Sequence, residues 1–220
     1  MSAGPPGAKP GRAQQAADLL TGLLLALLIL AWGMAYKGTL AAGWGQSLLL
    51  QTGQVGYLLL AASCTLGALT CTPWLSRVFS RHLRSGWHGV LSGFALALGA
   101  LHGAFSLVGP RPLSLPGALV PGLAGLQTAA MAAGTLALWT LAAVYLSYAL
   151  RNRLGMRASR TLHLLAYPAF AACTLHAVWV GHPGPLYILA SLAVGTALAL
   201  RLVALSLAPV RLALPAPRRD

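Results

Sequence analysis

Four histidines lie inside apolar segments of the chain, where an ionisable side chain is energetically unfavourable and indicates a functional site. His88 and His102 are fourteen residues apart (102 − 88), and His163 and His176 are thirteen apart (176 − 163). At ~1.5 Å rise per residue along a helix, each spacing separates two side chains by roughly 20 Å. The spacing therefore predicts two levels of imidazoles, one near each face of a bilayer.

The two levels pair the histidines if their helices run in the same direction. Equal depth then pairs His88 with His163 and His102 with His176, whereas antiparallel helices would exchange the partners. Imidazole is a good axial ligand for haem iron, and an apolar surround suits a porphyrin. The pattern predicts two stacked bis-histidine haems, an inner one held by His88 and His163 and an outer one held by His102 and His176.

The elements that must position these residues are transmembrane helices. The chain is 57% hydrophobic and only 8% charged, and Asp18 and Asp220 are its only acids, which excludes a soluble domain. Stretches rich in Ala, Leu and Gly, without long alternating runs, argue against a β-barrel. The sequence predicts an all-α integral membrane protein, a bundle of six transmembrane helices at about 18–36, 47–70, 86–108, 123–150, 161–181 and 185–207.

The net charge of +13 reflects membrane topology. Basic residues gather in the lead at 1–15, in the second and fourth connections and in the tail at 209–220, with few on the opposite side. The positive-inside rule then predicts cytoplasmic termini at the cell inner membrane, with the haem-binding domain spanning 16–208. The basic residues contact lipid headgroups first and a partner second, which argues against a nucleic-acid binder. The helix at 18–36 is expected to be an uncleaved signal anchor.

Helix geometry tests the pairing. Fourteen residues at ~100° each fall about 40° short of four turns, so His88 and His102 share a face. Thirteen residues leave an offset of roughly 140° between His163 and His176 on a straight helix. Pro168 lies between these two and cannot donate a hydrogen bond to a carbonyl, so we expect a kink or a local rewinding that corrects the offset.

Small and basic residues near the histidines are candidate cofactor contacts. Gly89 and Gly103 each follow a histidine, and their small size suits either the approach of a flat macrocycle or ordinary close packing of helices. Arg84, Arg160 and Arg201 lie toward the inner side and could pair with haem propionates, or extend to lipid headgroups.

Two segments, 72–105 and 151–180, resemble the ferric-reductase-like transmembrane domain, which includes ferric reductases, NADPH oxidases and the MsrQ group. The resemblance is carried by the histidine spacings and by the sequences "TP…R", "RLGMRASRTLH" and "LHLLAY". It implies that His88, His102, His163 and His176 ligate two b-type haems that pass electrons across the membrane. Size and the lack of a soluble domain are similar to the MsrQ group, whereas His88 is a feature of the oxidases.

The resemblance implies an external electron donor, because no G-x-G-x-x-G motif opens a nucleotide-binding domain. A cytoplasmic flavoprotein or a membrane quinol is expected to reduce the inner haem, with a flavin or quinone at that side. The outer haem would reduce a periplasmic or extracellular acceptor, such as ferric iron, a redox protein or dioxygen. Two alternatives are a transporter or channel that uses the histidines as a proton relay, and a non-redox assembly subunit that binds other helices.

Overall fold

The computed structural model describes residues 42–72, 87–108, 111–181 and 184–207, and within these ranges the regular structure is helical, without strands. The predicted lead at 1–15, the first predicted helix at 18–36, the connection that carries Arg84 and the tail at 209–220 lie outside the described residues. The described helices are α2 (Ala42–Thr70), α3 (His88–Phe105), α4 (Leu115–Leu119), α5 (Thr128–Ala149), α6 (Arg151–Leu154), α7 (Met156–His163), α8 (Ala166–Val180) and α9 (Pro185–Leu207).

Five helical segments of the described chain are long and apolar enough to cross a bilayer. They are Gly45–Thr70, His88–Phe105, Thr128–Ala149, Met156–Val180 and Pro185–Ser206. These match the second to sixth helices expected from hydropathy, with shifted ends. The protein is therefore a multi-pass membrane protein.

The connection before α5 differs from its prediction. Gly125 and Gln127 have positive φ angles of 74° and 46°, which a right-handed helix does not accept, so α5 begins at Thr128 and not at residue 123. The Pro/Gly-rich stretch that precedes α5 contains the short helix α4. Its first turn is capped by Ser114, whose hydroxyl accepts a hydrogen bond from the backbone N–H of Gly117 at 3.1 Å.

The predicted helix at 161–181 is divided into α7 and α8. The N–H groups of Leu164 and Leu165 donate to carbonyls three residues back, Thr161 at 3.2 Å and Leu162 at 3.0 Å. This is the tighter 3₁₀ pattern, which turns by ~120° per residue in place of ~100°. The distortion expected from Pro168 is therefore present, and it moves His163 and His176 toward a common face.

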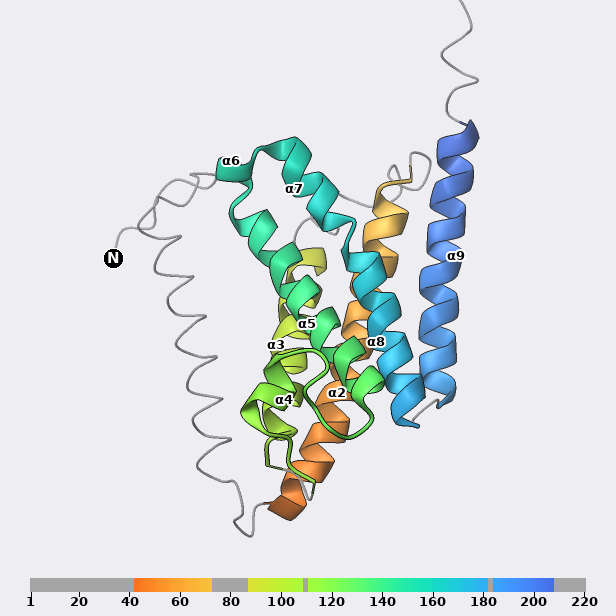
Figure 1. The fold of residues 1–220 in the computed structure, drawn as a ribbon. Helices are drawn as coiled ribbons and strands as arrows, with labels where there is room; N and C mark the ends of the chain where they lie inside the picture. Colours follow the sequence, from red (N-terminus) through yellow and green to blue (C-terminus); the bar gives the residue numbers. More distant parts are fainter. Residues whose placement is uncertain (1–41, 73–86, 109–110, 182–183, 208–220) are drawn as a thin grey trace, which may run out of the picture.

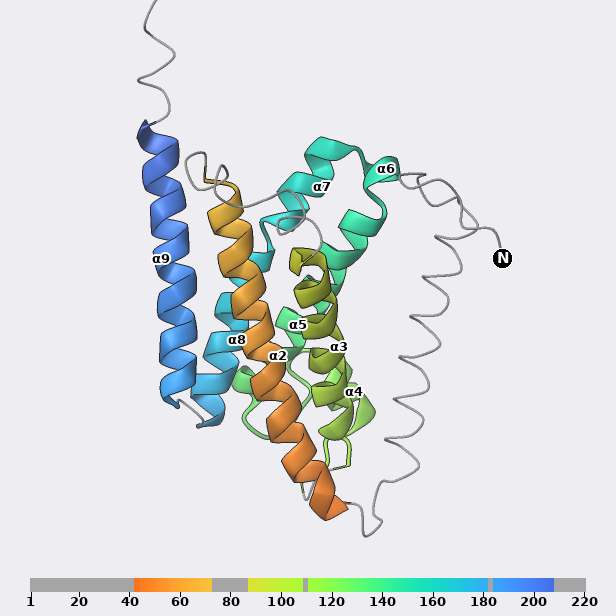
Figure 2. The ribbon, with the colours of Figure 1, turned by 180° about the vertical axis from the view of Figure 1, so that it is seen from behind.

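The helices form two closely packed antiparallel pairs that lie side by side. α2 packs along α3, α5 packs along α8, and α9 lies against α2 on the outside of the bundle (Figure 1, Figure 2). α6 and α7 cross the end of the bundle opposite α4 (Figure 1). Each histidine-bearing helix therefore has a close neighbour behind it and faces the other pair in front.

An aromatic cluster ties α2 to α8 and α9. The buried ring of Tyr57 stacks on Phe170 with centroids 5.2 Å apart. Its hydroxyl is 2.9 Å from the hydroxyls of both Thr174 and Ser191. A buried phenol in an apolar core needs such partners, so the network holds three helices at a fixed spacing.

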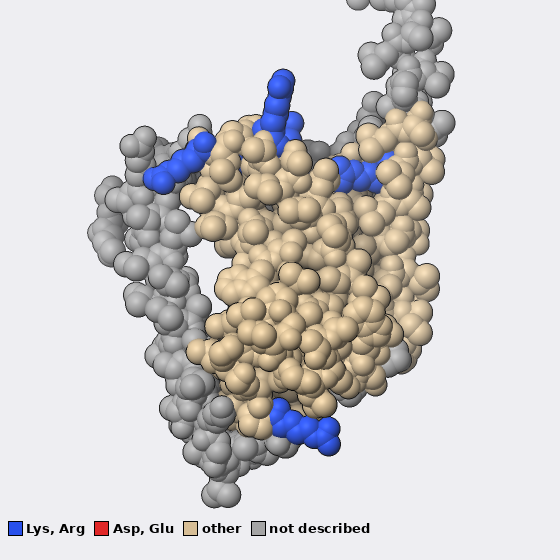
Figure 3. All heavy atoms as spheres, in the orientation of Figure 1, with Lys and Arg blue, Asp and Glu red and all other residues tan. Residues whose placement is uncertain are grey.

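The charged side chains of the described residues are all arginines, and most of them lie toward the two ends of the molecule (Figure 3). Asp18 and Asp220, the only acids of the chain, lie outside these residues. Four arginines lie between Arg151 and Arg160, on α6 and α7, and Arg111 lies in the connection at the opposite end. The intervening surface is apolar, as expected for a surface in contact with lipid.

Candidate functional site

The four histidines form two facing pairs between the helix pairs. The rings of His88 on α3 and His163 at the end of α7 have centroids 5.6 Å apart and planes inclined at 72°. The rings of His102 on α3 and His176 on α8 have centroids 5.9 Å apart and planes inclined at 80°. The pairing predicted from equal depth on parallel helices is therefore the one that the structure has. We call His88 and His163 the inner centre, and His102 and His176 the outer centre.

Both imidazoles of the outer centre are fixed by backbone carbonyls of the neighbouring helix. Nδ1 of His102 lies 2.8 Å from the carbonyl oxygen of Leu49, and Nδ1 of His176 lies 2.7 Å from that of Ala130. A carbonyl only accepts hydrogen bonds, so each Nδ1 carries the proton and donates it. The lone pair of each neutral ring is then on Nε2, where it is available to a metal ion.

Glycines behind the outer rings allow this close approach. A Cβ built on Gly53 of α2 would lie 2.6 Å from Nδ1 of His102, and one built on Gly134 of α5 would lie 2.9 Å from Nδ1 of His176. Each glycine follows its carbonyl partner by four residues (53 − 49 and 134 − 130), which places both on one helix face. We call this arrangement of a glycine and the carbonyl one turn earlier a histidine cradle.

His88 of the inner centre has the same kind of cradle on α2. Its Nδ1 is 3.2 Å from the carbonyl oxygen of Ser63 and 3.1 Å from the hydroxyl of that residue. A Cβ built on Gly67 would lie 3.3 Å from the ring, and Gly67 again follows Ser63 by four residues. Gly53 and Gly67 are fourteen residues apart (67 − 53), as are His88 and His102, so α2 repeats the cradle at each level of α3.

Proton counting fixes the tautomer of His88. The hydroxyl of Ser92 donates its single proton to the carbonyl of His88 at 2.7 Å. The Ser92 hydroxyl also lies 2.7 Å from the hydroxyl of Ser63, and in that contact it can only accept a hydrogen bond. Ser63 has then used its own proton on Ser92, and it can only accept from Nδ1 of His88. The proton of His88 therefore lies on Nδ1, and its Nε2 has the free lone pair.

His163 differs from the other three histidines. Its Nδ1 is buried and has no hydrogen-bond partner among the described residues. No described glycine has His163 among the nearest atoms that an added Cβ would meet. Instead, the carbonyl of Ser147 accepts a hydrogen bond from the hydroxyl of Ser159 on α7 at 3.2 Å. α7 is thus attached to α5 one turn before His163, and not through His163 itself.

Arg201 is a cation within the last apolar helix, close to the inner centre. Its guanidinium donates to the hydroxyl of Tyr167 at 3.2 Å and interacts electrostatically with His163. Among the described residues no acid accompanies it, so most of its five N–H donors are free for an anionic group. Arg160 is an exposed residue on α7, three positions before His163, and Arg84 lies outside the described residues.

The two glycines singled out from the sequence are not the ones that touch an imidazole. A Cβ on Gly89 would meet nothing within 4 Å, and one on Gly103 would meet only Leu138, at 3.9 Å. Gly103 does line the cavity beside the outer centre. The close approaches occur on α2 and α5, the helices that pack behind the histidines.

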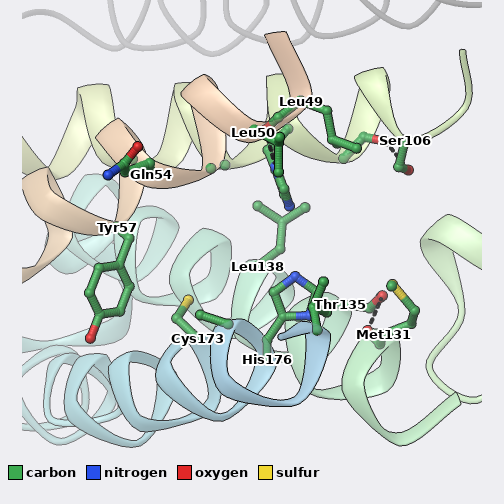
Figure 4. A pocket seen from close by; sticks show the side chains of 18 of the residues that line it. Leu49, Leu50, Gln54, Tyr57, Ser106, Met131, Thr135, Leu138, Cys173 and His176 are labelled. Carbon is green, nitrogen blue, oxygen red and sulfur yellow. Dashed lines mark hydrogen bonds between the residues drawn. The ribbon is translucent and has the colours of Figure 1, made fainter. Parts of the chain in front are cut away.

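A cavity of about 760 Å³ adjoins the outer centre. Its lining is largely apolar and includes His102, His176, the cradle glycines Gly53 and Gly134, and Arg111. His176 and Leu138 approach it from one side, with Leu49 and Leu50 opposite (Figure 4). This volume falls within the ~300–1,000 Å³ that is usual for small-molecule and cofactor sites.

The site offers metal ligands in pairs. Within the part of the chain that the structure describes, no three or more His, Cys, Asp or Glu side chains converge on one point. Comparisons with family models, curated proteins and solved structures found no match to this chain. The geometry of the two centres must therefore support any functional conclusion.

Proposed function

We propose that this protein carries electrons across a membrane through two b-type haems, each held between a pair of histidines. Nε2 of His88 and His163 would hold the inner iron, and Nε2 of His102 and His176 the outer iron. One observation carries the proposal: the imidazoles meet in pairs at two levels, and three of the four direct their Nδ1 proton to a fixed acceptor. That arrangement leaves the lone pairs of Nε2 for iron.

The distances between the rings are close to those that this role requires. With metal–nitrogen bonds of ~2.0–2.1 Å and a ring centre about 1.15 Å beyond the nitrogen, two imidazoles that share one iron would have centres roughly 6.3–6.5 Å apart. The observed separations of 5.6 and 5.9 Å are shorter, so the rings would move apart by less than about 1 Å to admit the iron. The inclined planes are compatible as well, because two rings that share an axis through the iron can take any rotation about it. The apolar cavity beside the outer pair has the character of a porphyrin site.

When bound, haem supplies reversible one-electron chemistry, and the protein supplies position and environment. The cradles fix the ring orientations of His88, His102 and His176. Arg201 provides positive charge beside the inner centre, where it can neutralise a carboxylate such as a haem propionate.

The orientation follows from charge. Four arginines lie on α6 and α7, at the end of the inner centre, and the positive-inside rule assigns such an end to the cytoplasm. We propose six transmembrane helices, including residues 18–36, in the cell inner membrane with both termini cytoplasmic. A cytoplasmic flavoprotein or a quinol would then deliver electrons to the inner centre, and the outer centre would pass them to an acceptor outside.

The rival function as a proton relay is less consistent with the ring hydrogen bonds. A relay histidine exchanges protons at both ring nitrogens. Here Nδ1 of His88, His102 and His176 each donate to an acceptor that is fixed in the backbone or in a closed hydroxyl chain. Such rings can ligate a metal ion but cannot readily pass a proton along.

The direct test is haem quantification on the purified protein by pyridine haemochrome. We expect two b haems per chain, and one in His102→Ala or His176→Ala, which should lose the outer haem and stop electron transfer while the inner haem persists. His82→Ala is the matched control, since His82 is a histidine of the chain that is not among the four proposed ligands, and this variant should retain two. Full haem content in both outer variants, or no haem in the native protein, would refute the proposal.

A further inference from the structure

The inner centre holds its two histidines with unequal restraint. His88 is fixed by Ser63 and backed by Gly67. His163 has a buried Nδ1 without a partner in the described residues, and no described glycine has His163 among the nearest atoms that an added Cβ would meet. Loss of a partner that orients a ligating imidazole typically weakens metal binding by about 10- to 100-fold.

The backbone around His163 is also loosely held. His163 is the last residue of α7, and the two residues that follow adopt the tighter 3₁₀ pattern before α8 begins. Its neighbours Leu162, Leu164 and Leu165 are 36%, 49% and 40% exposed, so little protein packs over this turn. Its helix is anchored through Ser159, a full turn away. The ring can therefore swing aside without breaking a hydrogen bond of its own.

We propose that His163 is an exchangeable ligand, so that the inner centre binds a small uncharged diatomic molecule such as carbon monoxide in its place. The outer centre does not, because displacing His102 or His176 would break a hydrogen bond to a backbone carbonyl and leave that carbonyl unpaired. This inference rests on the proposed function, since it requires haem at both centres. It adds a ligand-binding site at the cytoplasmic side of the electron path.

The test is the carbon monoxide difference spectrum of the dithionite-reduced protein, recorded after haem quantification. We expect one of the two haems to shift. The shift should persist in His102→Ala, which lacks the outer haem, and disappear in His88→Ala, which lacks the better-fixed inner ligand. Two haems without any shift would overturn the inference and leave the proposed function intact, whereas absence of haem would refute the proposed function itself.

Flash photolysis separates ligand exchange from simple damage to the protein. After a light pulse, carbon monoxide and His163 compete for the same position, so rebinding in the native protein should show a slow phase. Because the unrestrained His163 contributes less to haem binding than a ligand whose Nδ1 is held by an acceptor, His163→Ala should retain the inner haem through His88 and lose that phase. His176→Ala should leave the phase unchanged. A slow phase that survives in His163→Ala, or a shift that belongs to the outer haem, would overturn the inference.

Discussion

The outer and inner centres each consist of two facing histidines, but they differ in the residues that pack behind the imidazole rings. At the outer centre both imidazoles lie against a glycine and donate to a carbonyl one turn earlier. At the inner centre only His88 has that support, and His163 is at a helix end beside Arg201. Ligand identity is therefore the same at both levels, and the packing of the neighbouring helix decides how firmly each ligand is held.

The largest difference between the centres should come from filling an outer cradle. In Gly134→Ala the new methyl would lie 2.9–3.1 Å from three ring atoms of His176. Because a helix backbone cannot retreat locally, the ring should move and lose its bond to Ala130. We expect retention of the outer haem to fall about 10- to 100-fold, measured as the rate of haem transfer to apomyoglobin.

The matched control for that substitution is Gly195→Ala on α9. A Cβ there meets nothing within 4 Å, so haem transfer should keep the native rate at both centres. If the two alanine variants lose haem equally, the methyl groups act on the bundle as a whole, and the cradle at Gly134 has no special role.

A smaller effect is expected at the inner centre from Arg201→Gln. This change removes the cation beside His163 but keeps a polar side chain near Tyr167. Loss of a charge partner for an anionic group should speed inner haem loss by about tenfold, equivalent to ~1.4 kcal/mol. Tyr167→Phe serves as the control, because it keeps the charge, and little change is expected. Equal effects of both changes would assign the role to the hydrogen bond.

The smallest effect should follow Ser63→Ala. The hydroxyl is one of two acceptors for Nδ1 of His88, and the backbone carbonyl of the same residue, at 3.2 Å, remains in the variant. We expect inner haem loss to rise only about threefold, in line with one hydrogen bond of ~0.5–1.5 kcal/mol. A loss as large as that of Gly134→Ala would show that the hydroxyl, rather than the backbone, holds His88.

The pairing of the histidines could be predicted because it depends on positions along single helices, which can be counted from the sequence. Apolar runs mark the helices, the rise per residue converts spacing into depth, and Pro168 marks the point where the helix rewinds. The structure confirms the second to sixth helices, the pairing of the histidines and the rewinding between His163 and His176, whereas the first predicted helix lies outside the described residues. The ligand roles themselves stay a prediction.

The cradles could not be predicted in the same way. Gly89 and Gly103 were predicted contacts because they follow histidines in the sequence. Gly53 and Gly134 are neighbours of histidines only in space, and this proximity depends on how one helix is placed along another. A signal was nevertheless present, since Gly53 and Gly67 repeat the fourteen-residue spacing of the α3 histidines. The start of α5 was missed for a related reason, because hydropathy does not register the positive φ angles at Gly125 and Gln127.

The matched spacing on α2 and α3 restricts how the length of this protein can change. Inserting one residue between Gly53 and Gly67 would rotate one support by ~100° and lift it by ~1.5 Å relative to the other, so one imidazole would meet a side chain in place of hydrogen. A compensating insertion on α3 would be required to restore both. Evolution or engineering can therefore lengthen the ends and connections of these two helices, while the fourteen-residue intervals must be altered together or left alone.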